Sequence, residues 1–444
     1  MKRVYPTARV VFVITLATTI FGCKEASTVS PSYYANVKPI IDSKCVHCHD
    51  DAGLAPFQLK SYEAVFSARD IIKTTVQNQT MPPWLAASAC NEYAHDASLS
   101  PKQLKTILDW VDTGAEEGDI ENEGPPVVNP ARETRLTRED LILKMPIPYT
   151  PTVYPDDYRC FVLDWTAGPD EGYATGFRAD PGNLSIAHHV VAFLVPPDQV
   201  AAVEARDAAD EGNGYQCFGG PGGDELFTWL GAWAPGSLGN DFPEGTGMKL
   251  EEGSKIVMQM HYNMAYAAPE PDVTTISLKI EKEVEKEATI LLWLNPAWVR
   301  RHTMDIPAGQ SSIVHHFAAQ PSGWLGLLSG GKALQPGDSF NIHRGFVHLH
   351  ELGTGANLWL EKENGDTPCL LDIPRWDYNW QFGYSLKKPI RVDPGDTLHV
   401  ECRFDNSEDM QRIVDGQLLP PRDVNWGDGT QDEMCIGILN ISEI

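Results

Sequence analysis

The sequence has little positive charge for its length. Its 444 residues include 35 Lys and Arg against 61 Asp and Glu, which gives a formal net charge of −26 at pH 7. A surface of this sign repels other polyanions, which argues against nucleic acid and anionic membrane surfaces as partners. The length exceeds that of one ordinary domain and predicts about two to four domains.

The apolar run near the N-terminus is too short to span a bilayer. "VVFVITLATTIF" (10–21) has twelve residues and follows three basic ones, which are the proportions of a secretory signal. It ends in "IFGC", similar to a bacterial lipobox with Cys23 as the lipidated residue, although Phe21 is larger than usual there. An ordinary secretory signal is the alternative. We predict a lipoprotein-type signal peptide over 1–22 and an exported lipoprotein, periplasmic or attached to the outer membrane, that meets the membrane only through its anchor. Export would also allow disulfides to form.

No second cysteine pair lies near the Cys-x-x-Cys motif in "DSKCVHCHDD". A structural zinc site needs four donors, and the adjacent Cys48 and His49 would crowd one tetrahedral ion. A thioredoxin-like redox pair would need a βαβ context that is absent. Haem c uses Cys45, Cys48 and His49 together, since the cysteines bond the vinyl groups and His49 becomes an axial ligand. Met81 in "TMPPW" is the predicted second axial ligand.

Helical patterns surround this motif. In "LSPKQLKTILDWVDTGAEEGD", Ser100 and Gln103 form a capping box and Gly114 ends the helix. Segment 31–118 is therefore a predicted small all-α domain, and with its haem motif it resembles a class I cytochrome c. Residues 119–138 are acidic and then proline-rich, which indicates a linker.

After residue 139 the sequence lacks long helical periodicity. Short alternating runs such as "HHVVAFLV", "KIVMQMHYN" and "NLWLEKE" lie between turns rich in Gly, Pro and Asn. This pattern of short alternating runs and turns predicts an all-β region. Its length suits two jelly-roll-like β-sandwich domains, which we place at 139–285 and 286–444.

Histidine spacing within these strands indicates metal sites. In "FVHLHELG", His348 and His350 leave the same face of a strand. The adjacent His188 and His189 would face opposite ways on a straight strand, so joint ligation requires a bend or bulge. His261 lies on the more polar face at the end of its strand. Imidazole and thioether donors without a carboxylate favour copper, particularly copper that cycles through Cu(I).

Several short motifs follow one another in a recognisable order: "YRCFVLD", "AHHVVAFLV", "GYQCFGGPG", "LGAWAPG", "QMHYN", "IPAG", "FVHLHELG", "ECRFDN" and "DEMCIGI". Over roughly 145–444 the chain resembles the copper type II ascorbate-dependent monooxygenases. The resemblance implies two copper ions. The ligands of the electron-donating copper would be His188, His189 and His261. Those of the oxygen-binding, catalytic copper would be His348, His350 and Met434.

The resemblance also implies two disulfides, at positions that are bonded in the animal enzymes: Cys160–Cys217 and Cys402–Cys435. A bridge at Cys435 would hold the neighbouring methionine ligand in place. Two cysteines remain, Cys90 and Cys369, and these either pair across domains or stay free.

The chain departs from the peptide-hydroxylating members of the family at two substrate positions. Those enzymes carry an arginine two residues before the H-x-H motif and a tyrosine four residues after the methionine. Here the positions hold Phe346 and Ile438, while Arg344 is out of register by two. We therefore expect an apolar or uncharged substrate.

Together these observations predict an exported copper monooxygenase that hydroxylates an aliphatic C–H bond of a small molecule with O2. Electrons would pass from a periplasmic donor through haem c to the first copper and then to the second. One alternative is a haem- and copper-binding lipoprotein that carries electrons or handles copper without hydroxylation. Another is a structural or sensor lipoprotein whose metal-ligand residues are no longer maintained. All six ligand positions hold the expected donor residue, which argues against a loss of ligands. A carrier would keep the same donors as an enzyme, so they do not separate these two hypotheses.

Overall fold

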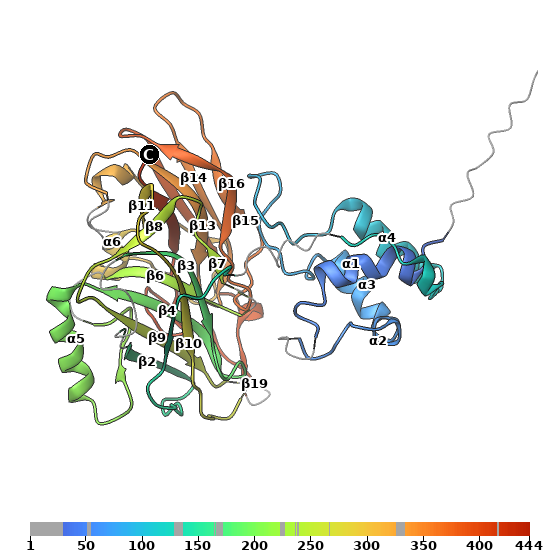
Figure 1. The fold of residues 1–444 in the computed structure, drawn as a ribbon, viewed down its shortest axis with the longest axis horizontal. Coiled ribbons are helices and arrows are strands. Elements are labelled where there is room, and N and C mark those ends of the chain that lie inside the picture. Colours follow the sequence, from blue (N-terminus) through green and yellow to red (C-terminus); the bar gives the residue numbers. More distant parts are fainter. Residues whose placement is uncertain are drawn as a thin grey trace, which may run out of the picture.

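The computed structural model describes residues 30–444 apart from 51–54, 128–135, 164, 166–171, 223–226, 236, 238, 266, 326–333 and 415–416. A helical unit stands beside a larger β body (Figure 1). The predicted signal peptide and Cys23 lie outside the described residues, as does part of the predicted linker. Within the described part of the chain, no helix is long and apolar enough to cross a membrane.

The helical unit has helices on both sides of the Cys-x-x-Cys-His motif, and the predicted helix with Ser100 and Gln103 at its start is one of them. Its elements are the π turn η1 (Tyr33–Val37), α1 (Lys38–Lys44), α2 (Tyr62–Ser67), α3 (Arg69–Gln77), α4 (Pro101–Asp112) and the 3-10 turn η2 (Ile120–Asn122). The side chains of Ser100 and Gln103 each bond the other's backbone N–H, which forms the predicted capping box of α4. Tyr33 and Trp110 are fully buried in an apolar core that belongs to this unit alone.

The largest sheet of the β body runs in the order β1-β10-β3-β8-β11-β20-β13-β16, with β7 beside β3. Its strands are β1 (Leu141–Lys144), β3 (Gly172–Asp180), β7 (Asn240–Asp241), β8 (Thr246–Leu250), β10 (Thr275–Glu281), β11 (Lys286–Trp293), β13 (Phe340–His348), β16 (Tyr384–Val392) and β20 (Ile436–Ser442). Every pairing along this order is antiparallel except that of β8 with β11, which is parallel.

Two smaller sheets complete the body. The five-stranded sheet holds β5 (Tyr215–Gln216), β2 (Asp156–Leu163), β9 (Lys255–Asn263), β4 (Ala187–Val195) and β6 (Thr228–Trp233). The four-stranded sheet holds β12 (Ile313–Ala319), β17 (Thr397–Phe404), β14 (Gly353–Glu361) and β15 (Cys369–Ile373). Outside them lie the hairpin β18 (Ile413–Val414) and β19 (Gln417–Leu418), the helices α5 (Pro197–Ala209) and α6 (Pro296–Arg301), and the turns η4 (Pro321–Gly323) and η5 (Glu408–Met410).

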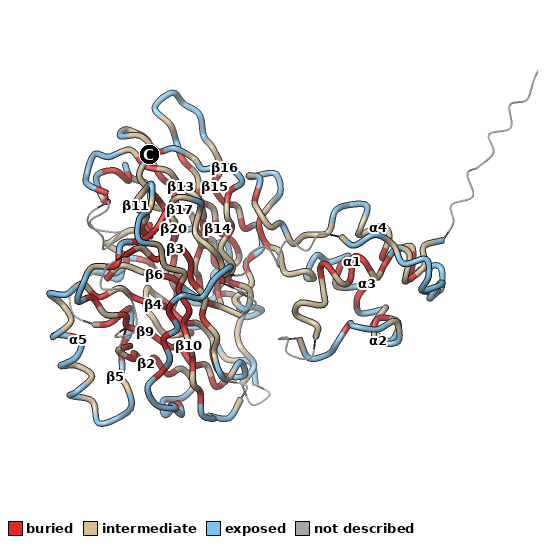
Figure 2. Tube along the Cα trace, viewed as in Figure 1, coloured by how far each residue is buried: buried red, intermediate tan, exposed pale blue. Residues whose placement is uncertain are grey.

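The two expected sandwiches share the large sheet. β8 and β11 join its halves through the pairs Lys286–Thr246 and Glu287–Gly247. One apolar core continues through both halves of the body (Figure 2). The mostly β architecture is consistent with β-sandwich domains, and the shared sheet fixes the two halves against each other.

The segment that follows α3, residues 81–97, connects the helical unit to the β body (Figure 1). Ala94 donates its N–H to the carbonyl of Ser385 at 2.8 Å. A disulfide joins Cys90 to Cys369. The two cysteines that the sequence left open therefore pair, and they tie this segment to β15.

Candidate functional site

Three histidines converge at one end of the five-stranded sheet. His188 and His189 lie on β4 and His261 on β9, and their ligand nitrogens lie within 4.8 Å of one another. The register between the strands shifts between Ala187 and His189, so His189 pairs with His261 and His188 is the extra residue of a bulge. The structure thus contains the bulge that joint ligation by adjacent histidines requires.

The Nδ1 atoms of the three rings face one another, and a carboxylate orients one of the rings. Nδ1 of His189 lies 3.3 Å from Nδ1 of His188 and 3.3 Å from Nδ1 of His261. Nε2 of His261 lies 2.9 Å from Oδ1 of Asp156, so Nε2 donates and Nδ1 keeps its lone pair. The ring of Tyr158 stacks on His261 with centroids 4.1 Å apart. Three imidazole nitrogens that meet at one point are a suitable donor set for copper.

The electrostatics of this cluster favour neutral rings. Burial lowers the pKa of His188 to about 4, and the neighbouring His348 adds to the effect. Burial and the surrounding histidines hold the pKa of His189 and of His261 well below the usual range. The rings are therefore uncharged near pH 7, which is the state that binds a metal.

The second histidine pair straddles a strand end. His348 is the last residue of β13 and His350 lies just beyond it, with ring centroids 5.0 Å apart. The sequence placed both on the strand, but the strand ends at His348, two residues before His350. Nδ1 of His348 lies 2.7 Å from Oε1 of Gln381, and Nδ1 of His350 lies 2.9 Å from the carbonyl of Asp432. Each Nδ1 donates, so each Nε2 keeps its lone pair. Burial lowers their pKa values to about 3 and about 4 respectively.

Met434 is held beside this pair through its backbone. The buried carboxyl group of Glu433 accepts the N–H of His350 at 2.8 Å and that of Met434 at 3.3 Å. Burial raises the pKa of Glu433 to about 8, although the N–H donors oppose the rise. The next residue, Cys435, is bonded to Cys402 on β17. The methionine backbone is thus fixed next to His350 from two sides.

The two histidine sets lie next to each other. The ring centroids of His189 and His348 are 6.1 Å apart. Tyr378, in the loop between β15 and β16, stacks on His188 with centroids 4.5 Å apart. Its carbonyl accepts a bond from Nε2 of Gln381 at 3.0 Å, and Oε1 of the same amide holds His348. This one loop contacts both sets.

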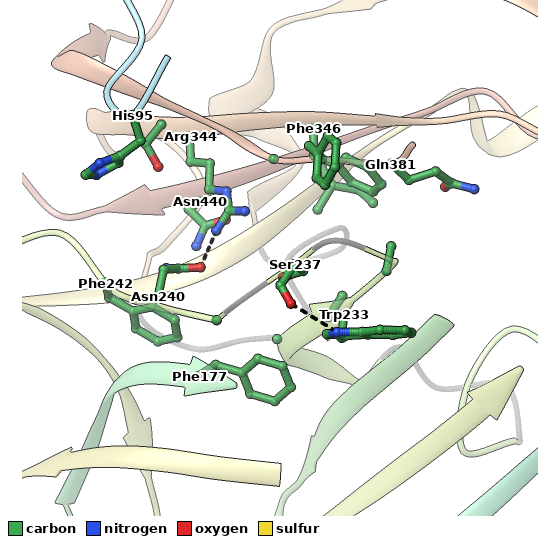
Figure 3. Close-up of a pocket in the computed structure, with 18 of the residues that line it drawn as sticks. His95, Phe177, Trp233, Ser237, Asn240, Phe242, Arg344, Phe346, Gln381 and Asn440 are labelled. Atoms are coloured by element: carbon green, nitrogen blue, oxygen red, sulfur yellow. Dashed lines mark hydrogen bonds between the residues drawn. The ribbon is translucent and has the colours of Figure 1, made fainter. Parts of the chain in front are cut away.

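A cavity of about 610 Å³ opens beside the histidines. Its lining includes His189 and His348 together with apolar side chains such as Trp233 and Phe346 (Figure 3). Cys48, from the Cys-x-x-Cys-His motif of the helical unit, lines the same cavity. The two histidine sets and the predicted haem motif therefore border one space.

Residues 332–440 match the family model described as the copper type II ascorbate-dependent monooxygenase, C-terminal domain. This part of the chain is similar to a copper monooxygenase domain. DBH-like monooxygenase protein 1 from Homo sapiens is 25% identical over 272 residues, which are 58% of this chain and 39% of that protein. Dopamine beta-hydroxylase from Canis lupus familiaris is 24% identical over 215 residues, which are 48% of this chain and 31% of that protein. The chain thus spans less than half the length of these relatives, and the matches support the copper type II family.

The structure contains both disulfides that the family resemblance implies. Cys160–Cys217 joins β2 to the residue that follows β5, and Cys402–Cys435 joins β17 to the residue that precedes β20. Each bridge links a strand to a residue outside the strands, and the second bridge directly follows Met434.

The Cys-x-x-Cys-His motif follows directly after α1. Cys45 and Cys48 are not joined in a disulfide. Burial raises the pKa of Cys45 to about 12 and that of Cys48 to about 11, the opposite of what a reactive redox pair needs. Nδ1 of His49 lies 2.9 Å from the carbonyl of Phe57, which leaves Nε2 available as a ligand. No described hydrogen bond or ring contact joins Met81 to His49, so their pairing as axial ligands stays a prediction.

The sequence did not reveal the groups that orient the histidines. Asp156, Tyr378 and Gln381 lie far from the ligands along the chain, and no spacing rule connects them with the histidines. Glu433 was missed as well, because it directly follows the polar run "GDGTQD" and nothing marked it as a carboxyl group in a buried position. A carboxyl group in such a position needs buried donors, and the structure supplies them.

Proposed function

We propose that this protein is a copper-dependent monooxygenase that hydroxylates an aliphatic C–H bond of a small molecule. The observation that carries the proposal is the placement of His189 and His348, 6.1 Å apart between ring centroids, on the wall of one cavity of about 610 Å³. A protein that only carries electrons or copper has no need of a cavity of this size. The cavity therefore favours an enzyme over a carrier.

In this proposal each histidine set holds one copper ion. His188, His189 and His261 would bind through Nδ1, and His348 and His350 would bind through Nε2 together with the thioether of Met434. Copper in such sites supplies one-electron steps to O2. The overall reaction consumes one O2, two electrons and two protons per substrate C–H bond, and yields the alcohol and water.

The chain's own residues position the ligands and shield the site. Asp156 holds the ring of His261 and Gln381 holds that of His348. Phe346 and Ile438 pair across β13 and β20, and both line the cavity. Their apolar side chains would contact the aliphatic part of a substrate and keep water from the reacting bond.

We further propose that Cys45 and Cys48 carry haem c with His49 and Met81 as axial ligands. The N–H groups of Cys48 and His49 both bond the carbonyl of Cys45, which places the two thiols one turn apart. Haem in this position would relay single electrons from a periplasmic donor. Because Cys48 lines the same cavity as the histidines, the relay path would be short.

The location of the protein is part of the same proposal. Residues 1–22 would direct export, and Cys23 would carry a lipid anchor. Three disulfides support an oxidising compartment.

The test of the enzyme proposal is substrate-dependent O2 uptake by the copper- and haem-loaded protein. Metabolite extracts are screened for compounds that gain one oxygen atom, and copper is measured per chain. We expect about two coppers and one hydroxylated product per O2 consumed. Protein that binds both coppers and reduces an artificial acceptor, but never consumes O2 faster with any extract, would be a carrier.

The haem proposal has a separate test. Haem bonded to Cys45 and Cys48 should stay with the chain through acid–acetone extraction. Met81→Ala should keep the haem but lower its reduction potential, because the thioether stabilises the ferrous state. Complete loss of haem from the denatured wild-type chain would contradict covalent attachment.

A further inference from the structure

The connecting segment, residues 81–97, belongs to the β body by its packing. Leu85, Ala86 and Tyr93 of this segment are buried in the apolar core of the body, whereas the helical unit has a separate core. Release of the segment would expose these side chains to water, which is unfavourable because burial of apolar surface is the main force that stabilises a fold. The segment is therefore an integral part of the body and not a free linker.

The same segment closes one edge of each of two sheets. β16 is the last strand of the large sheet, and β15 is the last strand of the four-stranded sheet. Tyr93 forms an antiparallel bridge with Leu386 on β16, and its hydroxyl donates to the carbonyl of Leu370 on β15 at 3.2 Å. The disulfide from Cys90 to Cys369 adds a covalent link to β15. Because edge strands present unpaired backbone groups, these contacts both cover the edges and hold the segment in place.

Two further contacts extend this attachment to the helices themselves. Arg375, in the loop after β15, donates from Nη2 to the carbonyl of Gln79 at 2.7 Å and from Nη1 to that of Asn78 at 3.5 Å, where α3 ends. Nζ of Lys44, the last residue of α1, donates to the carbonyl of Asp96 at 2.9 Å. The helical unit is thus anchored on both sides of the pinned stretch, and little free chain remains over which it could move.

The cavity beside the histidines takes its walls from both units. His189 and His348 line it from the body, together with apolar rings such as Phe177 and Trp233 (Figure 3). The helical unit and the connecting segment add lining residues that include His47, Cys48, His95 and Ala97. A molecule that fills this cavity therefore contacts residues of both units.

We propose that the helical unit is a fixed wall of the substrate cavity, held there by the connecting segment, so that one chamber serves both substrate binding and electron delivery. This inference rests on the proposed monooxygenase function and adds two features to it. The substrate is a small, mainly apolar molecule that touches both units, and the helical unit does not swing between electron transfers. Each transfer moves one electron, which oxidises ferrous haem and reduces one Cu(II) ion to Cu(I). The periplasmic donor of the proposed function then restores ferrous haem.

Calorimetric titration of the full chain, loaded with copper and haem, tests the wall directly. The probe is 2-naphthylmethanol, an uncharged aromatic alcohol, and no reductant is present, so no turnover occurs. Ala97→Trp places a large ring in the cavity lining and should weaken probe binding about tenfold or more. Ala89→Trp is the matched control, at an exposed position of the same segment outside that lining, and should leave the affinity within about threefold. Equal affinities of wild type and Ala97→Trp would overturn the proposal.

The fixed position is tested by the rate of electron transfer to copper. After flash reduction of the haem, its absorbance reports its reoxidation by Cu(II). In the wild type this rate should not change when sucrose raises the viscosity of the solution. Combining Arg375→Gln with Cys90→Ser and Cys369→Ser should slow the transfer about tenfold or more, because the reacting centres lose their fixed geometry, and should make it depend on viscosity. Arg301→Gln, at an exposed arginine of α6, is the control and should keep the wild-type rate. A wild-type rate that falls in proportion to viscosity would show that the unit swings, which overturns the proposal.

A failure of this inference can be separated from a failure of the function on which it rests. The titration is repeated on the chain without copper and haem, where the effect of Ala97→Trp should persist. If it persists while no extract stimulates O2 uptake, the wall stands and the monooxygenase proposal falls. If the haem is lost in acid–acetone extraction, the haem proposal falls and the titration alone decides about the wall. Thermal unfolding shows whether each variant is folded, and Ala97→Phe serves if the tryptophan variant is not.

Discussion

The two histidine sets differ in how the fold assembles them. The first comes from two neighbouring strands, β4 and β9, and a single bulge brings its nitrogens within 4.8 Å. The second takes His348 from a strand end, His350 from the turn beyond it and Met434 from a loop far along the chain. Strand pairing therefore builds the first set, whereas the second depends on loops, the Glu433 carboxyl group and a disulfide.

The different construction of the two histidine sets suits them to different tasks. The first set is covered by rings, since Tyr158 stacks on His261 and Tyr378 on His188. A site enclosed in this way can pass an electron with little rearrangement. One histidine of each set, His189 or His348, lines the cavity, but among the described ring contacts only His348 also has the apolar ring of Phe346 beside it, where a substrate has access. The comparison can be tested by damaging each set separately.

His189→Ala should have the largest effect, because Nδ1 of this ring contacts both of its partners at 3.3 Å. We expect copper to fall from about two ions to one per chain. Turnover should fall more than about hundredfold, because the variant loses a metal ligand itself, whereas loss of a residue that only hydrogen-bonds to a ligand costs up to about that much. Metal analysis and O2 uptake measure these changes. His316→Ala, at an exposed histidine on β12, is the control and should keep both ions. Retention of two coppers by His189→Ala would contradict the assignment.

Met434→His should separate the roles of the two sets. The soft thioether favours Cu(I), and imidazole is a harder donor. The Cys402–Cys435 bridge should keep the local backbone in place. The variant should bind copper and accept electrons at the first set, yet lose about 90% or more of its substrate-dependent O2 uptake. Unchanged O2 uptake would show that the methionine is not a ligand of the reactive metal.

The contrast between the two sets also explains what the sequence could reveal. The donors of the first set were visible because His188, His189 and His261 lie in short strand-like motifs that follow the order of the family they resemble. The bulge followed from one geometric requirement. The position of His350 was less accurate, because alternation continues in the sequence for two residues after the ladder hydrogen bonds of β13 end.

Long-range contacts were beyond the reach of sequence patterns. The parallel pairing of β8 with β11, which merges the two sandwiches into one sheet, depends on only two residue pairs. The Cys90–Cys369 bridge joins residues 279 positions apart. Helix α5 was also missed, because only Val203 is buried along its length and its apolar periodicity is weak.

Asp156→Asn and Gln381→Ala form a matched pair of smaller perturbations. Each removes the group that orients one ligand ring, His261 or His348. Changes of this kind cost about ten- to hundredfold in metal affinity. Copper titration should show weakening at the first set alone for Asp156→Asn and at the second set alone for Gln381→Ala. Equal weakening of both sets by either variant would mean that the sets are not organised independently.

Substitution of Tyr378 should have the smallest effect on copper affinity, and both histidine sets should share that effect. Its hydroxyl lies 3.3 Å from Oγ1 of Thr430, and burial holds its pKa above the usual value, so it stays a neutral phenol. Tyr378→Phe removes only that long hydrogen bond and should change copper affinity by no more than about threefold. Tyr378→Ala also removes the stack on His188 and frees the loop that positions Gln381. We expect about a three- to tenfold loss at each set, since an aromatic contact is worth about 1 kcal/mol. Copper titration of the two variants measures this, and a loss confined to one set would show that the loop does not couple them.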